Sequence, residues 1–241
     1  GPMARSVRDI ALALDVLAGH DAGDPGSVAT ARRHFGTDLA RGARGLRIGF
    51  VRHFHETDVD GHPEVVAALA EVARVLAKEG ADVREVRLPR LQELAGVQRV
   101  IMLAESWAIH AKWLRERPGD YAQTSRAKLL GGAFVSSGDY VRAQQLRTRM
   151  MAAVDNAMRD VDVLLTASSF DPACRIDDAV ELARTYPRQA RSPFNLTGHP
   201  ALAMMSGLSQ AGLPLSVQFV GRAHDEVTLL RAAAAYERAT K

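Results

Sequence analysis

The sequence has 241 residues, of which 47% are hydrophobic, and a net charge of +3. A chain of this length can bury roughly 70–75% of its unfolded surface, enough for one large core. Cys174 is the only cysteine, which excludes an internal disulfide and a cysteine-based zinc or redox pair. The apolar runs are too short to span a bilayer, no secretory leader is visible, and the basic residues are scattered among acidic ones. We therefore expect a cytoplasmic protein that binds neither membrane nor nucleic acid.

The first part of the chain predicts a capped helix and a polar loop. Ser6 and Asp9 fit a capping box, in which the two side chains satisfy backbone groups at the start of a helix. Apolar residues then recur with the spacing of one helical face until Gly19, a suitable stop. Residues 20–44 are polar and contain glycines, so they predict a loop with about one helical turn.

The next segment predicts a βαβ unit. Residues 46–51 form an apolar run typical of a buried strand, Pro63 opens an amphipathic helix that stops at Gly80, and residues 81–88 predict a second strand. The two strands are expected to pair in parallel, because a helical crossover returns the chain in the same direction.

A mostly helical excursion follows over residues 91–160, with breaks near residues 118–119, 131–132 and 136–138. These breaks predict three helices. Ser137 is expected to cap the third of them, which begins near Asp139.

The last part of the chain predicts a return to strands. Residues 161–166 are a short apolar strand, and residues 171–191 mix loop and helix. Residues 201–205 and 215–220 flank a turn and predict an antiparallel pair, after which Asp225 caps a final helix. All these elements together predict one α/β domain with a mixed β-sheet.

Residues 52–62 hold three histidines and three carboxylates, which are ordinary metal ligands. The segment leads from a strand into the helix at Pro63, and turns of this kind collect His, Asp and Gly without binding a metal. It also lacks the His-Glu-x-x-His register and the full calcium-loop pattern. We therefore expect a polar loop here, with no metal site and no cofactor.

Candidate nucleophiles and bases lack a context that activates them. Ser209 lies in Gly-Leu-Ser-Gln-Ala, which misses the second glycine of a nucleophile elbow and precedes a strand. Ser168 and Ser169 follow a strand end, a common place for site residues, but no base is spaced to activate them. His199 fits a general base or a hydrogen-bonded structural residue, and Cys174 has no activating neighbour. The residues by themselves favour a structural role for each.

Several stretches together resemble the amidase-signature family. Residues 1–9, continuing into 14–19, resemble the segment that follows the family's catalytic core. Residues 162–166 resemble its strand that ends in Thr-Pro-Thr, although Ala167 stands where the family has proline. The most specific stretches follow one another with the family's order and spacing, namely residues 193–202 (PFNLTGHPAL), 212–222 (GLPLSVQFVGR) and 225–231 (DEVTLLR).

The resemblance implies an α/β/α fold around a mixed sheet and hydrolysis of carboxylic amides by a Ser, cis-Ser, Lys triad with an oxyanion site of backbone amides. In the family these three residues precede the stretch that residues 1–9 resemble, so no position here inherits them. Residues 1–241 are therefore expected to be the C-terminal portion of an amidase and to be inactive alone. The absent strands would leave an open sheet edge and an apolar face for another chain to cover.

Ligands gather at the carboxyl ends of sheet strands, so we expect the loops after residue 165 and before residue 201 to line a substrate pocket. Thr166, Ser168 and Asn195 are the candidate contacts. Arg126 is a further candidate because a guanidinium binds a carboxylate bidentately, with an exposed helix arginine as the alternative. The expected partners are a small amide in the complete enzyme and a second copy in a homodimer.

Two other functions stay open. The first is a non-catalytic scaffold or interaction module that keeps the amidase fold. The second is the subunit of a glutamine amidotransferase that uses the same fold and releases ammonia from glutamine for tRNA amidation. Residues 195–202 resemble the general amidases more than that amidotransferase.

Overall fold

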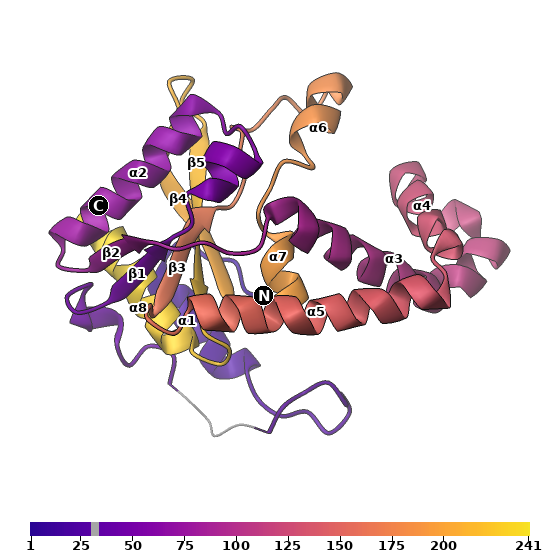
Figure 1. Ribbon diagram of the computed structural model, residues 1–241, viewed down its shortest axis with the longest axis horizontal. Helices are drawn as coiled ribbons and strands as arrows, with labels where there is room; N and C mark the ends of the chain where they lie inside the picture. Colours follow the sequence, from indigo (N-terminus) through magenta and orange to yellow (C-terminus); the bar gives the residue numbers. More distant parts are fainter. Residues whose placement is uncertain (30–33) are drawn as a thin grey trace. The chain divides into compact units, whose positions relative to one another are not determined.

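The computed structural model describes residues 1–29 and 34–241 (Figure 1), so part of the loop expected over residues 20–44 lies outside the described residues. The chain forms two compact units. Unit 1 consists of Gly1–Arg87, Ala157–Ala190 and His199–Lys241, and unit 2 of Leu88–Asn156 and Arg191–Gly198.

Unit 1 contains the sheet and most of the short elements. Its strands are β1 (Arg47–Phe50), β2 (Asp82–Glu85), β3 (Val163–Ala167), β4 (Ala201–Leu208) and β5 (Pro214–Gly221). Its helices are α1 (Val7–Leu17), α2 (Pro63–Lys78), α6 (Ala179–Thr185) and α8 (Glu226–Ala239), with a 3-10 turn η1 (Leu39–Arg41) and a π-helical turn η2 (Phe54–Asp58).

The five strands form one mixed sheet in the order β2-β1-β3-β5-β4 (Figure 1). β1 pairs in parallel with β2 and β3, whereas β5 runs antiparallel to β3 and β4. The expected mixed sheet, its βαβ unit and its antiparallel pair are therefore confirmed. The strand expected over residues 81–88 is shorter, since β2 spans Asp82–Glu85 and the last backbone hydrogen bond to β1 runs from Val86 N to Phe50 O.

The core of unit 1 lies around the middle strand. Every residue of β3 is buried, as expected for a strand that is covered on both faces. Helices α2 and α8 contact each other and both contact β3, β4 and β5, so they cover the same face of the sheet. The rings of Phe219 on β5 and Tyr236 on α8 lie 6.3 Å apart in this layer.

Helix starts follow the capping chemistry of the sequence, with one correction. The Ser6 hydroxyl accepts from Asp9 N at 3.1 Å at the start of α1, and Asp225 accepts from Thr228 N at the start of α8. The cap expected from Ser137 is wrong by one residue: Ser136 Oγ accepts from Asp139 N at 3.1 Å. Both serines carry a hydroxyl that can cap a helix, and the helix begins at Ser137, two residues before the expected start near Asp139.

Two arginines of unit 1 bind backbone carbonyls far away in the sequence. Arg222 Nη2 donates to the carbonyls of Met158 at 3.0 Å and Val161 at 2.7 Å, just before β3. Arg231 donates through Nε to Gly42 O at 2.9 Å and through Nη2 to Arg44 O at 2.8 Å. These donors satisfy carbonyls that no strand or helix pairs.

Unit 2 is helical, and residues 91–157 hold the helices α3, α4 and α5. It contains α3 (Leu91–Glu116), α4 (Gln123–Leu130), α5 (Ser137–Ala157, whose last residue falls in unit 1), α7 (Ser192–Thr197) and the 3-10 turns η3 (Pro118–Asp120) and η4 (Gly131–Phe134). η4 packs closely on α3, since a Cβ at Gly132 would lie 2.2 Å from the carbonyl oxygen of Leu103. Within the described residues, no helix is both long and apolar enough to cross a membrane.

Candidate functional site

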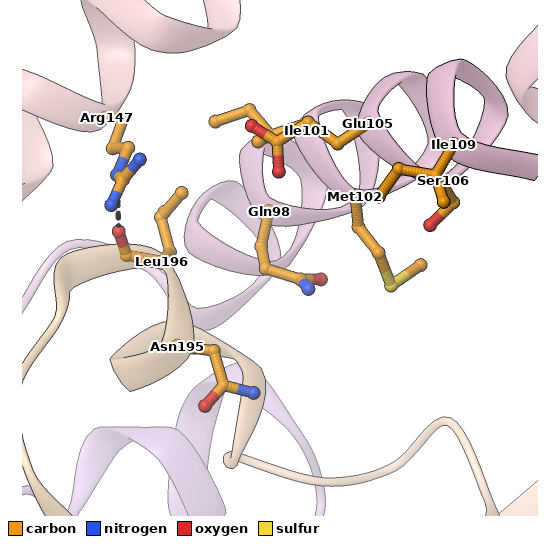
Figure 2. Close-up of a pocket in the computed structure, with 9 residues that line it drawn as sticks. All are labelled: Gln98, Ile101, Met102, Glu105, Ser106, Ile109, Arg147, Asn195 and Leu196. Atoms are coloured by element: carbon orange, nitrogen blue, oxygen red, sulfur yellow. Dashed lines mark hydrogen bonds between the residues drawn. The ribbon is translucent and has the colours of Figure 1, made fainter. Parts of the chain in front are cut away.

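A pocket of about 340 Å³ opens within unit 2 (Figure 2). Most of its wall is one face of α3, where positions three and four residues apart lie side by side. α5 contributes Arg147, and α7 contributes Asn195 and Leu196. The side chains from α3 are Gln98, Ile101, Met102, Glu105, Ser106 and Ile109.

The two charged groups of the pocket are held by protein partners. Arg147 Nε donates to the carbonyl of Leu196 at 2.8 Å, which fastens the C-terminal turn of α7 (Figure 2). The Tyr140 hydroxyl donates to Glu105 Oε1 at 3.1 Å and accepts from Gln144 Nε2 at 2.8 Å. These contacts reduce the freedom of both charges.

The open side of the pocket also presents uncharged polar and apolar groups. Gln98, Met102 and Asn195 extend toward the same open space in Figure 2. A carboxamide both donates and accepts hydrogen bonds, and a thioether is apolar and adaptable. Neither lysine nor histidine is among the nine lining residues, so Ser106 has no activating base there. The arrangement is suited to binding a neutral polar group beside an apolar one.

Two of the residues expected to contact substrate lie in unit 1. Thr166 is fully buried near the end of β3, where it pairs with Gln218 in the sheet, and its hydroxyl has no hydrogen-bond partner among the described residues. Ser168 is buried just after β3, and its carbonyl accepts from Ala190 N at 3.1 Å. Both stand at the carboxyl end of the strand, as expected, and their contact with a substrate stays a prediction.

The other two lie in unit 2. Asn195 is exposed on α7 and lines the pocket. Arg126 lies on α4, where its Nη1 donates to Pro118 O at 3.3 Å, and it is not among the side chains that line the pocket. A substrate contact of Arg126 stays a prediction that this pocket does not use.

The histidine-rich segment 52–62 packs into unit 1. The ring of His55 is 1% exposed, stacks on Phe50 with centroids 5.5 Å apart, and has no partner for Nδ1 among the described residues. His62 Nδ1 accepts from Glu64 N at the start of α2, and His53 lies 4.0 Å from Asp58. Across residues 1–29 and 34–241 no group of three potential ligands is arranged to hold a metal ion.

Burial determines the acidity of His55. Desolvation lowers its pKa to about 4, with Arg52 and His53 acting in the same direction and Glu56 opposing them. The imidazole is therefore neutral near pH 7, and its surroundings are those of a core residue.

Other candidate reactive groups also have structural contacts. Ser209 closes the β4–β5 turn, since its hydroxyl accepts from Leu213 N at 3.0 Å. His199 is buried. The hydroxyl of Thr185 contacts Cys174 Sγ at 3.6 Å.

A family model described as amidase matches residues 1–230. The chain belongs to the amidase family. The chain is 37% identical over 249 residues to an amidase of Pseudomonas putida, an alignment that covers 100% of the chain and 53% of the relative. It is 34% identical to one subunit of the glutamyl-tRNA(Gln) amidotransferase of Myxococcus xanthus, covering 99% of the chain and 54% of that relative.

Solved amidase-signature structures share the fold of this chain. A bacterial aryl acylamidase superposes with a TM-score of 0.80 at 26% identity, covering 100% of the chain and 52% of that structure. A protein from a vestigial complex connected with the origins of an s-triazine catabolic enzyme gives a TM-score of 0.88 at 27% identity, with 99% and 52% covered. The chain spans about half the length of the relatives it matches.

Several lining residues of the pocket were missed by sequence reasoning. Gln98, Met102 and Ser106 belong to no motif, and neither does Arg147. For the three residues on α3, the usable signal was their shared spacing along one face of the helix, but that spacing does not reveal which face is left open.

Proposed function

We propose that this chain is the C-terminal portion of an amidase that hydrolyses the C–N bond of a carboxylic amide, and that it acts only together with an N-terminal portion. The supporting observation is that nearly the whole chain aligns with amidases while covering about half of each. The resemblance assigns the Ser, cis-Ser, Lys triad to the part of the relatives that precedes this alignment. The 241 residues then supply scaffold and one wall of the substrate site.

The pocket in unit 2 supports a neutral amide as substrate. Its charged groups Arg147 and Glu105 already have protein partners, while Gln98 and Asn195 present carboxamides that pair well with an amide. Ile109 is 64% exposed at the pocket and offers a surface for an aryl or aliphatic group.

The test is a chimera that joins the N-terminal half of the Pseudomonas putida amidase to this chain. It should hydrolyse an aryl acylamide such as 4-nitroacetanilide and lose activity on treatment with a serine-directed reagent. The 241-residue chain alone should show no hydrolysis above background. Hydrolysis by the chain alone, unaffected by the serine reagent, would overturn the proposal.

Pocket variants of the chimera test the substrate assignment. Gln98→Leu and Asn195→Leu should each raise KM about three- to tenfold with little change in kcat, since one hydrogen bond contributes about 0.5–1.5 kcal/mol. Gln145→Leu, exposed on α5 and outside the pocket, is the matched control and should leave KM unchanged. If Gln98→Leu and Asn195→Leu have the same KM as the control Gln145→Leu, the pocket does not bind the substrate.

Glutamine hydrolysis is a second candidate, favoured by the glutamyl-tRNA(Gln) amidotransferase relatives at 31–34% identity. It predicts that the chimera releases ammonia from glutamine faster than from simple amides. A non-catalytic scaffold, the other alternative, predicts a folded chimera without hydrolase activity on either substrate.

A further inference from the structure

Helix α7 is too short to hold its own orientation. It spans six residues, less than two helical turns, and isolated helices of that length are not stable in water. Contacts with the rest of unit 2 therefore set its direction. Phe194 and Leu196 are buried, and Asn195 stands exposed between them at the pocket. The position of the Asn195 carboxamide depends on how these few contacts fix the helix.

The last turn of α7 has a carbonyl whose usual partner is missing. In a continuing helix the carbonyl of Leu196 would accept from the backbone N–H four residues on, but that residue is Pro200, which has no N–H. Gly198 ends the helix in the left-handed conformation at φ 77°, and its own N–H donates to Phe194 O at 2.9 Å. The Leu196 carbonyl therefore needs a donor from another element.

Arg147 on α5 supplies this donor. Its Nε lies 2.8 Å from the carbonyl oxygen of Leu196 (Figure 2), the residue next to Asn195 in the chain. The hydrogen bond is charge-assisted, and the negative end of the α7 dipole also favours a cation here. Because α5 has 21 residues, it is a firmer support than the short helix that it holds.

We infer that Arg147 is a positioning residue for substrate binding, which acts through the Leu196 carbonyl to hold the Asn195 carboxamide against the substrate amide. The inference rests on the proposed function, in which Asn195 and Gln98 bind that amide. Gln98 lies on α3 and does not use the α7 carbonyl, so only the Asn195 contact passes through Arg147. Arg147 also lines the pocket, and a direct hydrogen bond from its guanidinium to the substrate is the competing explanation.

The test measures KM and kcat for hydrolysis of 4-nitroacetanilide by the chimera described above. Arg147→Met keeps the length and apolar stem of the side chain and removes the donors. It should raise KM about three- to tenfold with little change in kcat, and no more than Asn195→Leu does, since the Asn195 hydrogen bond is all that it can lose. Arg149→Met, exposed on the same helix and outside the pocket, is the matched control and should leave KM unchanged.

Double variants separate positioning from direct contact. In a chimera that already carries Asn195→Leu, Arg147→Met should change KM by less than about twofold, because the group that it positions is gone. In a chimera that carries Gln98→Leu, it should raise KM by the same factor as in the parent chimera. A direct contact, or a general loosening of the pocket, would multiply KM in both backgrounds and would overturn the inference.

Hydrogen exchange gives a second measurement on the 241-residue chain itself. Arg147→Met should speed exchange of the Gly198 amide, which closes the last turn of α7, by about fivefold or more, while exchange in α3 does not change. Thermal unfolding of each variant verifies its fold. Unchanged exchange at Gly198 would show that Arg147 does not hold the helix.

The outcomes separate this inference from the proposed function. If the chimera is active and Arg147→Met leaves KM unchanged, the positioning role is wrong and the proposed function stands. If the chimera hydrolyses no amide, the proposed function is wrong, and calorimetric titration with acetanilide decides the inference by the same pattern in Kd. Absence of acetanilide binding as well would overturn both.

Discussion

Replacement of His55 should change how the stability of the protein depends on pH. The folded protein holds the His55 ring neutral, with a pKa of about 4 against 6.5 for a free histidine, because the ring is buried against Phe50. As the pH falls below 6.5, the unfolded chain takes up a proton that the folded chain excludes, so the free energy of unfolding falls. The loss from this residue is complete once the pH is below about 4.

The size of the effect follows from the two pKa values. The linkage relation gives a loss of about 2 kcal/mol at pH 5 relative to pH 8, rising to about 3 kcal/mol below pH 4. His55→Phe keeps an aromatic ring beside Phe50 but cannot take up a proton, so it should not show this part of the loss. His55→Leu serves as a second variant in case the larger ring does not fit.

The assay is urea unfolding of the parent chain and both variants at several pH values between about 8 and 4.5. Carboxylates also titrate in the lower part of this range, so the informative quantity is the difference between the parent chain and each variant. That difference should shift by about 2 kcal/mol in favour of the variant between pH 8 and pH 5. Parallel stability curves over this range would show that His55 is not the buried neutral group described above.

Three other substitutions have expected outcomes in urea or thermal unfolding. Asp171→Asn should lower the free energy of unfolding by about 3 kcal/mol, because the carboxylate is buried and lies 2.5 Å from Arg188. Asp177 is exposed, so Asp177→Asn should change that free energy by less than about 0.5 kcal/mol. Equal effects of the two substitutions would contradict the burial argument. Gly132→Ala should lower the free energy of unfolding by about 1–3 kcal/mol, because the added Cβ clashes with the carbonyl oxygen of Leu103. Gly96→Ala in α3, where a Cβ meets nothing within 4 Å, should raise that free energy by about 1 kcal/mol. A stabilising effect of Gly132→Ala would rule out the close contact. Arg222→Lys should lower the free energy of unfolding by about 1 kcal/mol, since one ammonium does not reproduce the planar guanidinium that reaches two carbonyls. Arg74→Lys, at an exposed ion pair, should leave the free energy of unfolding nearly unchanged.

The sheet was predictable because its strands carry their own signals. β3 reads as a continuous apolar run, and burial on both faces is the reason for that composition. The parallel pairing of β1 and β2 follows from the helix between them. The end of β2 was not predictable, since Val86, Arg87 and Leu88 have the same character as the paired residues before them.

The pocket was only partly predictable. Asn195 was accessible to sequence reasoning because it lies in the most specific of the family-like stretches. Gln98 and Arg147 come from helices far apart in the chain, and α3 has polar residues on all sides, so no single face is marked as functional. Which helix faces meet is decided by packing, which periodicity does not report.

The arginine contacts of unit 1 bear on how the protein responds to ionic strength. Arg231 donates to two neutral carbonyls, so these hydrogen bonds between distant segments do not rely on a paired anion whose attraction dissolved salt would screen. Arg222 combines its carbonyl contacts with an ion pair, because its Nη2 also lies 3.6 Å from Asp162 Oδ1. The hydrogen bonds from Arg231 to the carbonyls of Gly42 and Arg44 should therefore persist at salt concentrations that weaken ordinary surface ion pairs.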